Sequence, residues 1–424
     1  MNTQPKRSYR HMVGKEPYDI ALEDYDVSQR ELYQNMTFPG FFERMRKEDP
    51  VHYCKDSRFG PFWSITKFKD IMEIEGNPEI FSSEPTIAIL DFGDALPKIE
   101  MFIAMDEPKH GQQRKTVQDV VAPKNLAHLE SIIRERVETI LDSLPIGETF
   151  NWVDKVSIEL TGQMLATILG FPFEQRRKLT YWSDVATSVP GGPDSPAASY
   201  EEVGKILIGE LVPAFMELWE YRKENPGDFD MITLLTQGET TKNMASENTM
   251  EFLGNLMLLI IGGNDTTRNS ISGSVLFLNE NPKEYEKLRQ NLDLIPSMIS
   301  ETIRFQTPLT HMRRTVTQDT IFKGKKMKKG DKVVLWYVSG NRDSEEIENA
   351  DSFIIDRERP RHHISFGFGI HRCMGNRLAE MQLRIVWEEI MKRFEKIEVV
   401  GEVKRPYSNL IKGYTQLPVR LHSK

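Results

Sequence analysis

The sequence predicts a mainly α-helical protein with small β-sheets, of the α+β class, that forms one domain over residues 1–424. Three observations support this class. Helical periodicity covers far more of the chain than the alternation typical of strands. The alternating segments are short, so we expect small sheets at the edges of a helical body. No stretch rich in Pro, Gly or Ser divides the chain cleanly, which favours a single domain.

The first half of the chain combines one strand pair with several helices. Val51 to Thr66 has the pattern of two short strands with a turn near 56–60. The run 106–108, Asp-Glu-Pro, places an N-cap acid before a first-turn proline and predicts a helix that continues to about Val121. A loop is expected at the Pro- and Gly-rich stretch 189–196. Apolar periodicity predicts further helices at 125–144, 153–169 and 200–224.

The second half centres on a long helix, predicted from Thr249 to Asn279. It is apolar on nearly all faces around Leu256 to Ile261, and such a helix is buried in a large protein. The other elements expected here are a helix at 295–305, strands and a hairpin over 314–336 with a turn at 329–331, a helix at 375–394, and short C-terminal strands.

Composition and charge exclude several classes of protein. The net charge of −8 does not suggest a nucleic-acid partner. The two cysteines, Cys54 and Cys373, exclude a disulfide framework and favour a reducing compartment. The segment from Met1 to Ile20 is polar and mixed in charge, unlike a secretory signal. The longest apolar run, 256–261, is far too short to span a membrane. We therefore expect a cytoplasmic protein that is not integral to a membrane.

The loop before Cys373 is the most informative segment. Residues 366–375 read Phe-Gly-Phe-Gly-Ile-His-Arg-Cys-Met-Gly, and the glycines allow close backbone approach. The loop opens into a helix, so backbone N–H groups should lie near the sulfur and favour a thiolate, which donates electrons strongly to haem iron. A buried structural cysteine is an alternative. Zinc is another, with His362, His363 and His371 nearby, although the sequence lacks the paired ligands of most zinc sites.

Residues 262–267, Gly-Gly-Asn-Asp-Thr-Thr, interrupt the apolar pattern of the long helix. Each glycine weakens a helix by about 1 kcal/mol relative to alanine. Asp265 and Thr266 carry polar groups into apolar surroundings, which is costly without partners. The combination suggests a widened helix with room for a small ligand and a proton source beside it. A solvent-facing polar patch or a helix kink would have the same pattern.

Two charged pairs share helix faces. Glu301 and Arg304 are spaced i, i+3 and can form an ion pair. His110 and Arg114 are spaced i, i+4, and two potential cations on one face suit an anion such as a carboxylate. Taken alone, both pairs are more typical of solvated surfaces.

The cysteine loop resembles the haem-binding signature of the cytochrome P450 family, Phe-Gly-x-Gly-x-His-x-Cys-x-Gly, at every fixed position. The resemblance implies a triangular helical prism with haem b between the long central helix and the helix that follows the loop. Cys373 would be the axial ligand of the iron, and Phe366 and Gly367 would contact the cofactor.

The resemblance also implies roles for the other motifs. Thr266 would hydrogen-bond dioxygen, the co-substrate, and Asp265 would relay protons from solvent. Glu301 and Arg304 would form a buried structural pair, completed by Arg357 or, because of the spacing to the loop, by Arg359. The residues that match propionate-binding positions are His110, Arg114, Arg314 and His363, with His371 and Arg372 as weaker candidates.

Longer runs are similar to one branch of this family, the soluble bacterial alkane hydroxylases. The runs are 101–106, 262–267, 307–314, 336–343 and 366–380. Those enzymes hydroxylate the terminal carbon of medium-chain alkanes, fatty acids or related chains. The substrate would then contact Met101, Phe102, Ile103, Leu258, Gly262, Leu309, Met312, Leu410 and Ile411, which are almost all apolar.

Other functions stay open at this point. They are P450 monooxygenation of a terpenoid or steroid-like substrate, a peroxide-driven haem-thiolate enzyme, and a haem-based sensor or carrier. The family implies electrons from NAD(P)H, delivered by a flavin-containing ferredoxin reductase and a [2Fe–2S] ferredoxin. Candidates for a basic docking patch on the Cys373 side are Lys109, Lys115, Lys124, Arg361 and Arg372.

Overall fold

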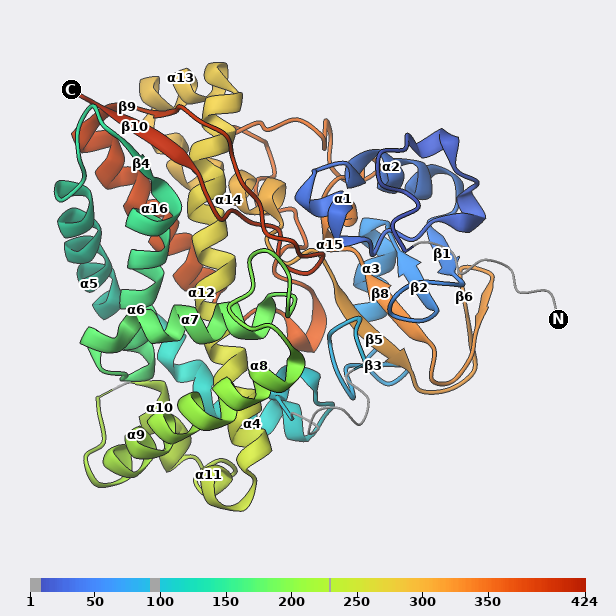
Figure 1. Cartoon of the computed structure of the whole chain (residues 1–424), viewed down its shortest axis with the longest axis horizontal. Coiled ribbons are helices and arrows are strands. Elements are labelled where there is room, and N and C mark those ends of the chain that lie inside the picture. Colours follow the sequence, from blue (N-terminus) through green and yellow to red (C-terminus); the bar gives the residue numbers. More distant parts are fainter. Residues whose placement is uncertain (1–8, 92–99, 229) are drawn as a thin grey trace.

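The computed structural model describes residues 9–91, 100–228 and 230–424 (Figure 1). Residues 1–8 belong to the N-terminal segment that was predicted to be unlike a secretory signal, and they lie outside these ranges. Most helices gather in one larger body, and the largest sheet lies beside it with α1 (Arg30–Gln34), α2 (Phe38–Glu48) and α3 (Phe68–Glu75). The predicted α+β class is confirmed.

The largest sheet contains five strands in the order β1-β2-β8-β5-β3. Their bounds are β1 (Val51–Cys54), β2 (Phe62–Ile65), β3 (Phe81–Ser82), β5 (Met312–Val316) and β8 (Lys332–Leu335). Only the β2–β8 pair is parallel. The predicted strand pair at 51–66 is therefore confirmed as β1 and β2. The distant strand β8, which begins at Lys332, pairs with β2 and extends the sheet.

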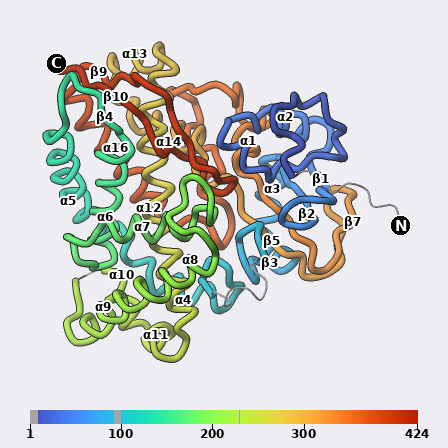
Figure 2. The backbone as a smooth tube through the Cα atoms, viewed as in Figure 1, coloured from blue at the N-terminus to red at the C-terminus, as the bar shows by residue number. Residues whose placement is uncertain are grey.

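Two smaller sheets complete the strands. One joins β4 (Thr149–Asn151), β10 (Pro418–Ser423) and β9 (Phe394–Val399) in that order. It lies at the end of the helical body away from the five-stranded sheet, as Figure 2 shows. The other is the hairpin of β6 (Thr320–Phe322) and β7 (Lys325–Met327). A hairpin within 314–336 and C-terminal strands were both predicted. The hairpin turns at 323–324, however, and the predicted turn at 329–331 joins β7 to β8.

The long central helix is confirmed as α12 (Thr249–Glu280), and its apolar segment is largely buried. The helices that pack against it include α6 (Glu159–Leu169), α7 (Arg176–Thr187), α13 (Pro282–Gln290), α14 (Ile295–Gln306) and α16 (Asn376–Arg393). The sequence predicted α6, α14 and α16 but not α7 or α13. Only Tyr285 and Leu288 are buried on α13, which is too few for a clear periodic signal.

The helix expected from Asp106 begins later, as α4 (Lys109–Val117), and continues as a 3₁₀ segment to Val121. Asp106 does not cap it, because its carboxylate accepts hydrogen bonds from the Ser82 hydroxyl and the Ser83 N–H beside β3. The following helix, α5 (Pro123–Asp142), begins at Pro123 rather than 125, since a proline is accommodated in the first turn.

Two predicted helices contain π-helical turns. The helix predicted at 153–169 begins with a π segment at Val153–Ile158. The helix predicted at 200–224 consists of α8 (Tyr200–Ile206), a π segment at Leu207–Leu211 and α9 (Val212–Glu224). Pro213 follows the second π segment and has no N–H, so the regular hydrogen-bond ladder cannot continue through it.

The remaining short helices are α10 (Met231–Gln237), α11 (Met244–Glu247) and α15 (Tyr337–Gly340). Within the described part of the chain, no helix combines the length and the apolar character needed to cross a membrane.

Candidate active site

A cavity of about 1570 Å³, counted out to its mouth, lies between α12 and the cysteine loop. Its wall includes Thr266 of α12 on one side and Cys373 on the other, together with residues of α4, α6 and α16. A molecule bound in this cavity would therefore contact α12 and the cysteine loop together.

The cysteine loop has a fixed backbone. The Cys373 N–H donates to the carbonyl oxygen of Phe366 at 2.8 Å. Gly367 and Gly369 both have φ of +67°, the left-handed region that favours glycine. A Cβ on Gly369 would lie 2.3 Å from the carbonyl oxygen of Glu75, so this position also needs glycine for close approach to α3.

The sulfur of Cys373 faces the cavity and is otherwise surrounded by protein. Burial raises the pKa of the Cys373 thiol, although hydrogen bonds from the Gly375 and Asn376 N–H groups and the charges of Arg114 and Arg372 oppose this. The donors expected from the sequence are therefore present, but burial outweighs them. A bound metal cation would lower the pKa of the Cys373 thiol despite its burial, because a thiol that coordinates a metal loses its proton.

The glycine pair of α12 has two separate roles. The helix is α-helical over its whole length, so the predicted widening is wrong. A Cβ on Gly262 would meet nothing within 4 Å. The open space beside α12 at this position is therefore present because glycine has no side chain. A Cβ on Gly263 would lie 2.9 Å from Leu165, so this glycine lets α12 pack against α6. The Thr266 hydroxyl donates to the Gly262 carbonyl at 3.1 Å and lines the cavity.

Asp265 points away from the cavity and is fully buried. Its carboxylate accepts a hydrogen bond from Ser183 of α7 at 2.8 Å and pairs with Arg268 at 2.5 Å. Arg268 also binds Asp184 at 2.8 Å. These three charged residues adjoin a second cavity of about 790 Å³, lined by Asp184 and Arg268. Arg268 thus connects Asp265 to the second cavity, and Asp265 makes no direct hydrogen bond to Thr266 among those the structure describes.

A buried ionic cluster supports the chain just before the cysteine loop. Both oxygens of Glu301 accept from Arg304, at 2.7 and 2.8 Å. Arg357 donates to Glu301 at 2.9 Å, whereas Arg359 is exposed and contacts His362. Of the two alternatives left open by the sequence, the geometry selects Arg357. Arg304 also donates to carbonyl oxygens of Asn341, Ala350 and Ser352.

Three of the six residues expected to bind propionates line the cavity. His110, Arg114 and His371 line it, and the rings of the two histidines lie 4.1 Å apart. Burial lowers the pKa of His110, and that of His371 to about 2. Among described residues, His110 Nε2 and both ring nitrogens of His371 are buried without a hydrogen-bond partner. Buried polar atoms normally have partners, so these atoms fit an anionic group of a bound cofactor.

The other three do not line the cavity, and Arg372 among them is exposed. Arg314 is buried and donates to Glu75 at 3.1 Å and to the Arg313 carbonyl oxygen. His363 does not line the cavity, since its ring lies beside Phe366 and accepts from the Ser365 N–H. The zinc alternative gains no support, because the nearby His362 turns toward Arg359 and Glu346.

The cavity wall is largely apolar and matches the expected substrate contacts only in part. Leu410 and Ile411 do not line it, because Ile411 pairs with Leu309 in a β-bridge and faces the second cavity. Met101 precedes a 3₁₀ turn at 102–104 and is not on the wall either. The expected contacts that do line it are Phe102, Ile103, Leu258, Gly262, Leu309 and Met312, with Phe366 and Gly367 on the loop side.

Sequence reasoning missed several residues of the site. The wall also contains Met164, Leu165 and Ile168 of α6, whose periodicity is that of ordinary core packing. Asn341 accepts from the Ile364 N–H and donates to Ser365, which fixes the approach to the loop. Glu75 contacts the loop directly. No local sequence signal distinguishes Asn341 or Glu75 from surface polar residues.

The expected docking cations lie in different environments. Lys109 pairs with Glu100 and Glu251, and Arg361 pairs with Glu380. The other three, Lys115, Lys124 and Arg372, are exposed. Near these residues, Arg114 donates to the Arg372 carbonyl oxygen at 2.6 Å, which links α4 to the cysteine loop.

Comparison with known proteins agrees with this geometry. A sequence model described as Cytochrome P450 matches residues 199–418. The chain is 36% identical to linalool 8-monooxygenase from Pseudomonas putida, over 94% of this chain and 99% of the relative. It is 30% identical to a methyl-branched lipid omega-hydroxylase from Mycobacterium bovis, over 96% of each chain. The solved structure of cytochrome P450-153 from Novosphingobium aromaticivorans matches with a TM-score of 0.86 and 42% identity, over 94% of this chain and 99% of that one.

A cysteine that is exposed to a large cavity, opposite a polar helix segment, is the arrangement expected of a haem-thiolate protein. The chain belongs to the cytochrome P450 family and has its fold. It is therefore a monooxygenase that uses haem and dioxygen. With haem bound in this cavity, Cys373 would be the residue available to hold the iron, and His110, Arg114 and His371 would be available to the propionates.

Proposed function

We propose that this monooxygenase hydroxylates the terminal carbon of medium-chain alkanes, fatty acids or similar linear apolar chains. The observation that supports this most is the composition of the cavity. Cys373 and Thr266 share one space with an apolar wall formed by Phe102, Leu258 and Leu309. A linear apolar chain would fill that space without leaving buried polar groups of the protein unpaired.

The shape of the cavity must then determine which carbon of the chain is hydroxylated. An apolar pocket discriminates weakly between chain lengths, since one methylene contributes only about 1 kcal/mol. The methyl group at the chain end has a stronger C–H bond than internal carbons, so the wall must present only that end to the reacting centre. Gly262 leaves space at the α12 side, where the chain end would lie beside Thr266.

The haem, when bound, supplies the electron-transfer and dioxygen chemistry that inserts one oxygen atom into the C–H bond. Thr266 would donate a hydrogen bond on the cavity side of α12. Asp265 would carry protons inward from the polar second cavity. Because Asp265 is paired with Arg268 and Ser183, it must leave at least one of these partners to reach Thr266.

Electrons would come from NAD(P)H through a flavin-containing ferredoxin reductase and a [2Fe–2S] ferredoxin. The ferredoxin would dock in the cytoplasm on the face that carries Arg372, Lys115 and Lys124. Arg372 is next to Cys373 in sequence and is exposed, so it marks the side of the molecule nearest the sulfur.

The names of two relatives favour attack at a defined position of a chain. One acts on methyl-branched lipids at the omega position, and the other acts on linalool at position 8. The second name supports an alternative substrate class, a short branched terpenoid.

Spectral titration of the ferric protein tests this proposal. The titrants are alkanes and fatty acids of graded length, linalool and a steroid, followed by product analysis with ferredoxin and reductase. Tight binding and terminal alcohols from linear chains support the proposal. Products from linalool or a steroid alone would select the alternative substrate. Haem binding without any product would favour a sensor, and full activity with peroxide alone would favour a peroxide-driven enzyme.

A further inference from the structure

A buried carboxylate outside the known motifs touches the cysteine loop. Glu75 is the last residue of α3, and its side chain is 1% exposed. One oxygen accepts from the Tyr337 hydroxyl at 2.6 Å and from Arg314 at 3.1 Å. The other oxygen accepts from the Phe368 N–H at 2.9 Å. Glu75 therefore joins α3, β5, α15 and the loop.

Local preferences disfavour an acid at this position. The C-terminal end of a helix carries partial negative charge, which repels a carboxylate. Burial adds a desolvation cost that a neutral side chain would avoid. Residues that break local rules in this way are typical of functional sites. Packing alone therefore does not account for Glu75.

The partners of Glu75 match an anion. The Arg314 guanidinium and the Phe368 N–H can only donate, and the Tyr337 hydroxyl donates in this geometry. Burial raises the pKa of Glu75, while Arg314, Tyr337 and Phe368 oppose that rise. The backbone of α3 reinforces the contact, because Gly369 packs against the carbonyl oxygen of Glu75 itself.

We propose that Glu75 is a positioning residue of the haem-thiolate site, which fixes both the cysteine loop and Arg314 and places a buried negative charge at the edge of the cavity. Arg314 and Tyr337 connect this charge to the cavity, since Tyr337 lines it. A fixed negative charge favours ferric over ferrous iron. The carboxylate therefore sets the reduction potential as well as the loop geometry. The proposal rests on the haem-thiolate assignment of Cys373.

Two variants separate the effect of the Glu75 charge from the effect of its hydrogen bond to the Phe368 N–H. Glu75→Gln keeps the size but removes the charge, and Glu75→Asp keeps the charge but shortens the reach to Phe368. The matched control is Glu73→Gln on the same helix, because Glu73 is exposed and pairs only with Lys323 among the described residues. All are measured as holoproteins by redox titration without substrate and by amide hydrogen exchange of the peptide containing Phe368.

For Glu75→Gln we expect a more positive midpoint potential. The equilibrium constant for reduction should rise by a factor of roughly 3 to 10, which corresponds to about 30–60 mV for one electron. For Glu75→Asp we expect a potential near that of the wild type and roughly tenfold faster exchange at Phe368. Glu73→Gln should change neither quantity.

An unchanged potential in Glu75→Gln, or unchanged Phe368 exchange in Glu75→Asp, would overturn the proposal. If Glu75→Gln does not retain haem, the exchange of Glu75→Asp decides the question alone. A wild-type protein without the red-shifted band of a thiolate-ligated carbon monoxide complex would instead refute the assignment of Cys373. The two failures are therefore distinguishable.

Discussion

The two sides of the cavity are held in place by different forces. On the cysteine side, the buried Glu301 and Arg304 form an ionic cluster with the partly buried Arg357, and Glu75 and Asn341 bind the backbone of the loop. The rest of the wall is largely made of apolar side chains such as Phe102, Leu258 and Met312, which pack without directional bonds. Directional bonds specify one geometry, whereas apolar packing tolerates exchange of similar volumes.

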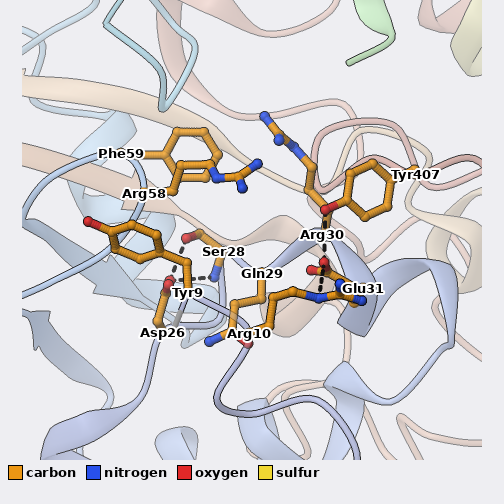
Figure 3. Close-up of a pocket in the computed structure, with 10 residues that line it drawn as sticks. All are labelled: Tyr9, Arg10, Asp26, Ser28, Gln29, Arg30, Glu31, Arg58, Phe59 and Tyr407. Atoms are coloured by element: carbon orange, nitrogen blue, oxygen red, sulfur yellow. Dashed lines mark hydrogen bonds and ion pairs between the residues drawn. The ribbon is translucent and has the colours of Figure 1, made fainter. Parts of the chain in front are cut away.

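The polar side of the cavity therefore serves the chemistry, and the apolar wall serves the choice of substrate. The polar side fixes the position of one sulfur atom and permits little change. The apolar wall can change its shape while the fold persists. Elsewhere, a pocket of about 270 Å³ near the N-terminus is lined by Arg30, which lies over the rings of Phe59 and Tyr407, and by Glu31, which accepts a hydrogen bond from Tyr407 (Figure 3). It contains neither a cysteine nor an apolar wall.

The largest effect should follow from breaking the ionic cluster. Glu301→Ala leaves Arg304 and Arg357 buried without their acid, and loss of one partner of a buried pair costs about 3–5 kcal/mol. We expect a protein with little bound haem and a much lower urea midpoint. The control is Glu43→Ala, which removes an exposed pair with Lys47 on α2. Equal stability of Glu301→Ala and the control would contradict the importance of the cluster.

Next in size is the effect of Thr266→Ala. The hydroxyl on the cavity side is lost, so proton delivery should fail more often and electrons should be diverted to peroxide. We expect several-fold less alcohol per NAD(P)H, with substrate affinity nearly unchanged. Product and peroxide are measured in the same reaction. Thr267→Ala, on the neighbouring residue, is the comparison. Unchanged coupling in Thr266→Ala would exclude the proposed relay.

A smaller change is expected from narrowing the apolar wall. Gly262→Val places methyl groups in open space beside Thr266, so the helix should tolerate it while the chain end is displaced. The ratio of terminal to internal alcohols should shift by roughly 10-fold or more. Gly209→Val, at an exposed glycine that also has open space, is the control. An identical product ratio in both variants would place the chain end elsewhere.

The smallest effect concerns acid stability. Burial lowers the pKa of His311 to about 3, against about 6.5 in the unfolded chain. Between these values the unfolded chain binds a proton that the native protein does not, so stability falls as pH decreases from about 6.5. The slope is roughly 1 kcal/mol per pH unit. Urea unfolding at pH 6.5 and 5 should show a smaller loss in His311→Gln than in the wild type. The exposed His128→Gln controls for removal of a histidine, and an equal loss in all three proteins would assign the acid lability to other groups.

The sequence predicted the elements whose signals are local. The loop before Cys373 and the pairs at Glu301 and His110 are short motifs with fixed spacing, and α12 has a long apolar pattern. The sequence could not predict the direction in which a side chain points. Asp265 was identified as polar and buried, but nothing in its neighbours shows that it turns toward Ser183 and Arg268 instead of the cavity.

Contacts between distant segments were likewise invisible in the sequence. Glu75 lies at the end of a short helix whose charged residues look like a solvated surface, and it meets Phe368 only through the fold. Ile411 was expected on the cavity wall, but its β-bridge to Leu309 turns it to the second cavity. The π-helical turns also depend on packing that a periodic pattern does not record.

The bond between Cys373 and haem iron is tested most directly by the absorption spectrum of the reduced protein under carbon monoxide. The wild type and Cys54→Ala should both show the red-shifted Soret band of thiolate ligation, and Cys373→Ala should lose it. A band at the position typical of histidine ligation in the wild type, or its persistence in Cys373→Ala, would contradict the account.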